Sequence, residues 1–210
     1  MNFINIVKRI TPSFHEVRKD IELLRLSNPG ITPEKLSQLY GKKIRNKYTS
    51  VGIATSLPGI IPGIGTAAQL AVEAGSVSAD LAMMLRWMAT LCYGTAYIYG
   101  RDIEQDFENE FTIVLGLWAG VLTSEEITTA KATAITAGHF DKHIADRIKN
   151  RMNQKVWRKL ALKYGAKRSG IIGGKLIPFG IGAVIGGSFN YSTMQRFGNE
   201  ANEYFKIAAK

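Results

Sequence analysis

Two uncharged segments rich in proline and glycine constrain this chain more than any other feature of its sequence. Residues 57–65 read LPGIIPGIG and residues 176–187 read LIPFGIGAVIGG, and each follows a strongly basic stretch. Glycine and proline destabilise the interiors of helices and strands, so they are usually kept at the ends of elements. Here they occur in the most apolar parts of the chain, which predicts tight hairpins or helix ends buried in protein or lipid. The predicted structural turns involve Pro58, Gly59, Pro62, Gly63, Gly65, Pro178, Gly182 and Gly186.

The rest of the sequence predicts helices almost throughout. Apolar residues recur at helical spacing from Ser13 to Leu26, and Asn28-Pro29-Gly30 ends this pattern. Thr32-Pro33-Glu34 supplies a cap, a first-position proline and a first-turn acid, so a second helix begins there. That helix combines a basic surface with one apolar stripe, formed by Leu36, Tyr40, Ile44 and Tyr48.

A second basic amphipathic helix is predicted from residue 140 to about 168, where apolar residues recur every four positions. Between the two basic helices, a further helix is expected from about Thr66 to Tyr99. The uncharged runs 87–100 and 111–124 each contain 14 residues. At about 1.5 Å per residue neither run reaches across a hydrocarbon core of about 30 Å, which favours buried helices of a bundle.

The charge of the chain favours a negatively charged partner. Its 27 Lys and Arg residues outnumber 17 Asp and Glu residues, for a formal net charge of +10. Such a partner is anionic lipid, nucleic acid or an acidic protein. No motif that reads nucleic acid is present in the sequence, and basic charge alone gives non-specific binding only.

The single Cys92 excludes an internal disulfide framework and favours a reducing compartment.

The glycine-rich segments and several residues around them carry a resemblance to a known family. The matching positions are Leu57-Pro58-Gly59, Pro62 to Gly65, Asp80, Tyr99 to Asp102, Gly173-Gly174, Pro178, Gly182-Ala183, Gly186-Gly187, Asn190 to Thr193, Gly198, Ala201 and Phe205. In this order they resemble the EcsC family, which is named after a bacterial protein encoded beside an ABC transporter. The resemblance covers roughly residues 30 to 207. It implies a helical, membrane-associated protein, and it supplies no catalytic residues.

Two carboxylates are the only candidates for chemistry. Asp80 lies in an otherwise apolar predicted helix, where a buried carboxylate must be paired, hydrogen-bonded or neutralised. A structural partner such as Arg86 or Lys175 is one interpretation, and a functional acid is the other. Asp102 is expected to cap a helix that begins near Ile103. Asn190 and Thr193 are polar-site candidates near the second glycine-rich segment.

Several other patterns carry no chemistry in this interpretation. His139 and His143 are one helical turn apart, but the lysines and arginines around them oppose a bound cation, so no metal is predicted. The Gly180-Ile181-Gly182 run lacks the preceding strand that a dinucleotide site requires, and no cofactor is predicted. Cys92 lies among apolar residues, which indicates an inert buried thiol.

The sequence therefore predicts an all-α protein, a single helical bundle with two Pro/Gly-rich apolar hairpins and basic amphipathic helices. Residues 1–29 form an N-terminal helical extension, and residues 30–210 form the EcsC-like domain. The expected function is non-catalytic and accessory: binding of anionic lipid or of a membrane protein from the cytoplasmic side, with insertion of the apolar segments left open. The alternative is a membrane-linked hydrolase that uses Asp80 or Asp102. The predicted anionic-surface contacts are Lys42, Lys43, Arg45, Lys47, Arg151, Lys155, Arg158 and Lys159.

Overall fold

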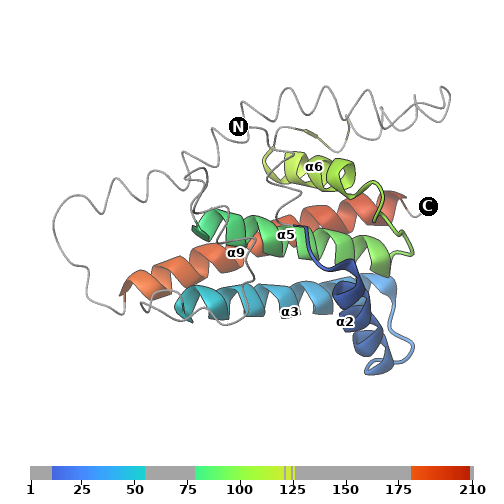
Figure 1. The fold of residues 1–210 in the computed structure, drawn as a ribbon, viewed down its shortest axis with the longest axis horizontal. Helices are drawn as coiled ribbons and strands as arrows, with labels where there is room; N and C mark the ends of the chain where they lie inside the picture. Colours follow the sequence, from blue (N-terminus) through green and yellow to red (C-terminus); the bar gives the residue numbers. More distant parts are fainter. Residues whose placement is uncertain (1–10, 55–78, 121, 124, 126–180, 209–210) are drawn as a thin grey trace. The chain divides into compact units, whose positions relative to one another are not determined.

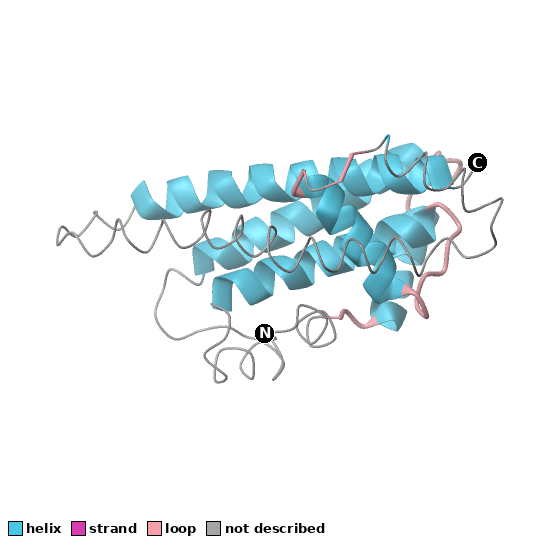
Figure 2. Cartoon of the chain, turned by 90° about the horizontal axis from the view of Figure 1, so that it is seen from above, coloured by secondary structure: helices cyan, strands magenta, loops and turns pink. Residues whose placement is uncertain are grey.

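The computed structural model describes residues 11–54, 79–120, 122–123, 125 and 181–208, with side chains for 11–49, 83–120, 122–123, 125 and 191–207. All regular structure in these ranges is helical, as Figure 2 shows. The prediction of an all-α fold is confirmed. The chain divides into two compact units, Met1–Gln105 with Leu176–Lys210, and Asp106–Lys175.

The first unit contains four of the described helices: α2 (Phe14–Leu26), α3 (Pro33–Ala54), α5 (Ala79–Ile98) and α9 (Ile181–Ala208). Helices α3, α5 and α9 pack against one another lengthwise, and α2 crosses them while contacting α5 and α3 (Figure 1). The colour gradient of Figure 1 shows that α9 runs antiparallel to α3 and in the same direction as α5.

The start signals of the first two helices act as the sequence predicts. The Ser13 hydroxyl accepts a hydrogen bond from the Glu16 N–H and caps α2. Pro33 is the first residue of α3, and the Thr32 hydroxyl accepts the Lys35 N–H. A local signal determines both starts, because a cap satisfies backbone N–H groups that have no partner within the helix.

The apolar stripe of α3 forms one wall of the core. Leu36, Tyr40, Ile44 and Tyr48 are all at least 97% buried, which confirms this prediction. Helix α5 is buried almost all round over residues 83–98, which agrees with the prediction that residues 87–100 belong to a buried helix. Helix α9 completes the core with Met194, Phe197, Ala201, Tyr204 and Phe205.

The second unit contains helix α6 (Phe107–Trp118) among its described residues. Nine of its twelve residues are buried, and the rings of Phe107 and Phe111 stack with their centroids 5.6 Å apart. Residues 111–118 of the uncharged run 111–124 thus belong to a buried helix, as predicted, and α6 ends at Trp118. No helix among the described residues combines the length and the apolar character needed to cross a membrane.

The turn predicted at Gly182 and Gly186 is wrong, because both glycines lie within α9. Glycine lowers helix stability by about 1 kcal/mol relative to alanine but does not forbid a helix whose other residues pack well. The remaining predicted turn residues, Pro58 to Gly65 and Pro178, lie outside the described residues. So does the predicted basic helix 140–168. The proposed boundary between residues 29 and 30 stays a prediction.

Candidate functional site

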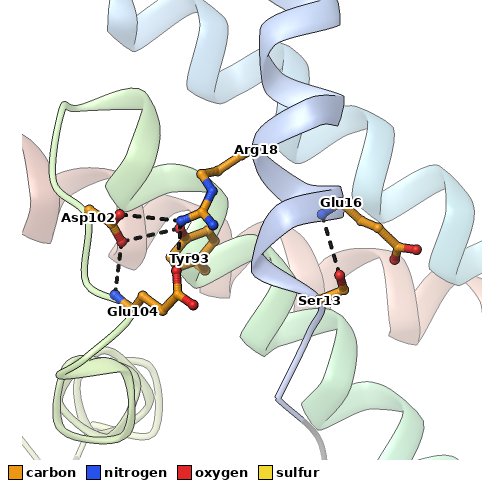
Figure 3. Close-up of polar contacts among 6 residues, drawn as sticks. All are labelled: Ser13, Glu16, Arg18, Tyr93, Asp102 and Glu104. Carbon is orange, nitrogen blue, oxygen red and sulfur yellow. Dashed lines mark hydrogen bonds and ion pairs between the residues drawn. The ribbon is translucent and has the colours of Figure 1, made fainter.

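A polar cluster connects α2 to the end of α5 and to the loop that follows it (Figure 3). The Arg18 guanidinium of α2 donates to the Tyr93 hydroxyl at 2.9 Å and contacts the carboxylates of Glu104 at 2.7 Å and Asp102 at 3.3 Å. The Tyr93 hydroxyl in turn donates to Asp102 at 3.3 Å. Gly100 makes this arrangement possible, because its φ of 79° lets the chain turn back after α5.

Asp102 has a structural role in this cluster. Besides its contacts with Arg18 and Tyr93, its carboxylate accepts the Glu104 N–H at 3.1 Å. The prediction that Asp102 caps a helix beginning near Ile103 is wrong: residues 104–106 form a turn, and α6 begins at Phe107. The short side chain of Asp102 caps this turn locally instead.

The cluster alters the acidity of Tyr93. Burial of the ring and the negative charge of Asp102 raise the pKa of the Tyr93 hydroxyl to about 12. The ring packs against Phe14 of α2, with centroids 4.4 Å apart. Tyr93 is therefore a neutral hydrogen-bonding link at physiological pH, and it does not act as a base.

A cavity of about 450 Å³ lies between α2, α3 and α5, and we call it the cationic cavity. Its apolar wall includes Leu23 and Trp87, and three basic side chains line it from three different helices. These are Lys19 of α2, Lys47 of α3 and Arg86 of α5. Lys19 and Arg86 form no ion pair within the described part of the chain. Glu16 and Asp20 also line the cavity.

Asp20 is neutralised by two lysines of α3. Lys43 approaches its carboxylate to 3.1 Å and Lys47 to 3.4 Å. Burial opposes ionisation of Asp20, but the hydrogen bond and charge of Lys43, with the charge of Lys47, hold the pKa of Asp20 below its ordinary value. Two positive charges thus compensate one negative charge, and the surroundings of the cationic cavity keep a positive excess.

A second cavity, of about 360 Å³, follows the line where α3 and α9 meet, and we call it the amide groove. Four carboxamides line it: Gln38 comes from α3, and Gln195, Asn199 and Asn202 come from α9. Leu91 of α5, which is buried, contributes an apolar side chain to the same lining.

The two ends of the amide groove carry opposite charges. At one end Lys206 bridges to Glu34 at 3.0 Å, and Glu203 also lines the groove there. At the other end the Arg45 guanidinium lies over the Tyr191 ring, 4.3 Å from its centroid. The Arg45 Nε atom is shielded from solvent and has no hydrogen-bond partner among the described residues. The positive charge of Arg45 therefore lies at the end of the groove opposite to Glu203.

The predicted anionic-surface residues of α3 have different environments. Lys42 and Lys47 are exposed and Lys43 is partly exposed, and Lys43 and Lys47 share Asp20. Arg45 lies in the amide groove rather than on the open surface. The other predicted contacts, Arg151, Lys155, Arg158 and Lys159, lie outside the described residues.

The remaining candidates are not brought together among the described side chains. Asp80 belongs to α5 and Asn190 to α9, but the side chains of both lie outside the described set. Thr193 is 97% buried. Cys92 is buried in α5, as predicted. His139 and His143 lie outside the described residues, and no group of three potential metal ligands occurs within the described part.

Sequence reasoning missed Arg18 and the amide groove. The partners of Arg18 are 75 to 86 residues away, so no local pattern reveals them. The amides of α9 did leave a signal, because positions 195, 199 and 202 repeat at the spacing of one helix face. The spacing alone does not identify the partner helix, because Gln38 lies in α3, more than 150 residues earlier in the chain.

Fold and cavities together define a small all-α protein whose described bundle carries a cationic cavity on one side of α3 and an amide-lined groove on another. The model of the EcsC protein family matches residues 63–207, well over half of the chain. The chain belongs to the EcsC protein family. No curated protein and no solved structure matches it.

Proposed function

We propose that this protein binds the surface of anionic membranes in a non-catalytic, accessory role. The cationic cavity carries the proposal, because it combines basic side chains from three helices with an apolar wall. A lipid phosphate is attracted to such a rim, while the adjoining apolar wall accepts the first part of an acyl chain. The net charge of +10 acts in the same direction over a longer range.

Exposed leucines beside the cationic cavity support the proposal that this side of the bundle faces the membrane. Leu23 lines the cavity and is 52% exposed, and Leu26 follows one helical turn later with 79% exposed. On a helix, residues three apart share a face, so both leucines project from the same side of α2. Apolar side chains next to basic ones are typical of helices that lie in the membrane interface.

Flotation of the full chain with lipid vesicles tests the proposal. We expect the protein to float with vesicles that contain phosphatidylglycerol and to remain in the soluble fraction with neutral vesicles. The double variant Lys19→Gln/Arg86→Gln is expected to weaken binding about 30-fold, at roughly 1 kcal/mol for each basic side chain. Lys35→Gln/Arg196→Gln removes the same charge from exposed positions outside the cavity and serves as the control.

Two outcomes contradict the proposal. Protein that stays soluble with both kinds of vesicle does not bind membranes in the proposed way. Equal losses for the two double variants assign the binding to overall charge and exclude a role for the cationic cavity.

The hydrolase alternative makes a separate prediction for Asp102. If Asp102 were a catalytic acid or base, Asp102→Asn would abolish function in a protein that still folds. We propose instead that its carboxylate holds the turn after α5, because it already accepts from Arg18, Tyr93 and the Glu104 N–H. The expected consequence of Asp102→Asn is a small loss of stability with vesicle binding retained.

A further inference from the structure

We propose that the amide groove binds the main chain of an extended peptide segment of another protein. The proposal is independent of membrane binding, because it uses a different cavity on the other side of α3. The carboxamides, the length of the groove and the charges at its two ends all suit such a ligand.

The carboxamides match the chemistry of a peptide backbone. Each carries a carbonyl acceptor and an NH₂ donor, the same pair of groups that every peptide bond presents. Gln38, Gln195 and Asn199 are exposed, and their side chains form no hydrogen bond within the described part of the chain. The Tyr99 hydroxyl donates to the Asn202 carbonyl at 2.9 Å, which leaves the NH₂ group of Asn202 for another acceptor.

The spacing of these amides suits an extended chain. Residues four apart on a helix are separated by about 6 Å along its axis, which applies to Gln195 and Asn199. An extended peptide presents equivalent groups on one side every two residues, or about 6.7 Å. Flexible side chains accommodate this difference, so neighbouring amides reach successive backbone groups of one bound segment.

Two glycines of the amide groove lie against Leu91. Gly41 of α3 and Gly198 of α9 both line the groove, and both positions face a methyl group of Leu91. A Cβ at position 41 would lie 4.0 Å from Leu91, and one at position 198 only 3.2 Å. The absence of both side chains lets Leu91 pack close to the backbones of α3 and α9 at this part of the groove.

The charged ends favour a peptide over other ligands. A lipid phosphate or a nucleic acid would meet Glu203 and Glu34, and a purely apolar ligand would leave the amides without partners. A peptide segment with an acidic group near Arg45 and a basic group near Glu203 complements both ends. From Glu34 to Arg45 the groove extends about 16 Å, the length of roughly five extended residues.

Two peptide pools added to the full-length protein, without membranes, test the proposal. One pool contains random-sequence pentapeptides, and the other has the same composition with N-methylated peptide bonds, which cannot donate. In nuclear magnetic resonance spectra we expect the first pool, at millimolar concentration, to shift the side-chain amide signals of Gln195 and Asn199. We expect the N-methylated pool to leave these signals in place.

Variants then locate the binding. Gln195→Ala/Asn199→Ala is expected to raise the apparent dissociation constant of the first pool at least about tenfold, the effect of losing hydrogen bonds at two positions. Gln105→Ala, an exposed amide outside the groove, is expected to leave the constant unchanged. Should the groove signals fail to move, or move equally with both pools, the groove does not recognise a peptide main chain.

Discussion

Tyr93 is the residue at which α2, α5 and the following loop are connected. Its hydroxyl accepts from Arg18 and donates to Asp102, and its ring packs on Phe14. The hydrogen bond to Asp102 requires the protonated hydroxyl, whereas Arg18 can also donate to the ionised oxygen. Ionisation of Tyr93 would place its negative charge beside the carboxylate of Asp102. The stability of the first unit is therefore linked to the protonation of this one side chain.

The linkage predicts a loss of stability at high pH. The pKa of Tyr93 lies at about 12 in the folded chain, against an ordinary value of 10.0. The folded state thus holds this proton more tightly, and the stabilisation is complete below pH 10.0 and disappears as the pH rises towards 12. Chemical unfolding of the wild type across this range should show a falling free energy of unfolding.

The control for this prediction is Tyr93→Phe, which removes the ionisable group but keeps the ring. Burial also raises the pKa values of Tyr40, Tyr97 and Tyr99, so the wild type and the variant both lose stability in alkali. We expect a shallower decline for Tyr93→Phe than for the wild type. Identical slopes would show that Tyr93 does not carry the linkage.

Helices α3 and α5 pack closely where Gly94 faces the Tyr40 ring. A methyl group at position 94 would overlap the Tyr40 ring, with its Cζ atom only 2.7 Å away. Tyr40 is fully buried and its hydroxyl donates to the Thr90 carbonyl at 3.5 Å, so displacing the ring would disturb that hydrogen bond and the core around it. The glycine is therefore a packing requirement of this helix pair.

The substitution Gly94→Ala is predicted to destabilise the protein by about 1–3 kcal/mol, which is the typical cost of overpacking a core. Gly41→Ala is the matched control, because its Cβ meets Leu91 at an ordinary 4.0 Å. That change is expected to leave stability unchanged or to raise it by up to about 1 kcal/mol, since alanine favours the helix. Urea unfolding of both variants measures the difference, and equal stabilities would contradict the close approach at Gly94.

The helices also show which features a sequence can reveal. The starts of α2 and α3 depend on Ser13, Thr32 and Pro33, which act within one turn of their own position, and these predictions are confirmed. The buried stripe of α3 follows from its four-residue period in the same way. Residues whose effect is local leave local patterns.

Predictions that depended on distant partners were less successful. Asp102 was expected to cap a helix, but its environment is determined by Arg18, 84 residues earlier in the chain. Gly182 and Gly186 were expected in a turn because glycine has a low intrinsic helix propensity, and tertiary context outweighs that preference in α9. The amide groove requires two helices at once, so it exists only after α3 and α9 have packed.

On the scale of the whole molecule, α3 separates two surfaces with different chemistry. Its Lys47 lines the cationic cavity with residues of α2 and α5, and its Gln38 lines the amide groove with residues of α9. Tyr40 and Ile44, which are buried, line the cationic cavity but not the amide groove. The two proposed activities, membrane binding and peptide binding, therefore use different side chains of one rigid helix.

This separation predicts that each activity can be removed without the other. Lys19→Gln/Arg86→Gln should lose vesicle flotation and keep the peptide-induced shifts, because neither residue lines the amide groove. Gly41→Ala should show the reverse, since a methyl group beside Leu91 narrows the groove while α3 stays folded. Both assays on both variants, with unfolding curves to verify the fold, complete the comparison. Joint loss of the two activities in either folded variant would mean that they share one binding surface, and the division at α3 would be wrong.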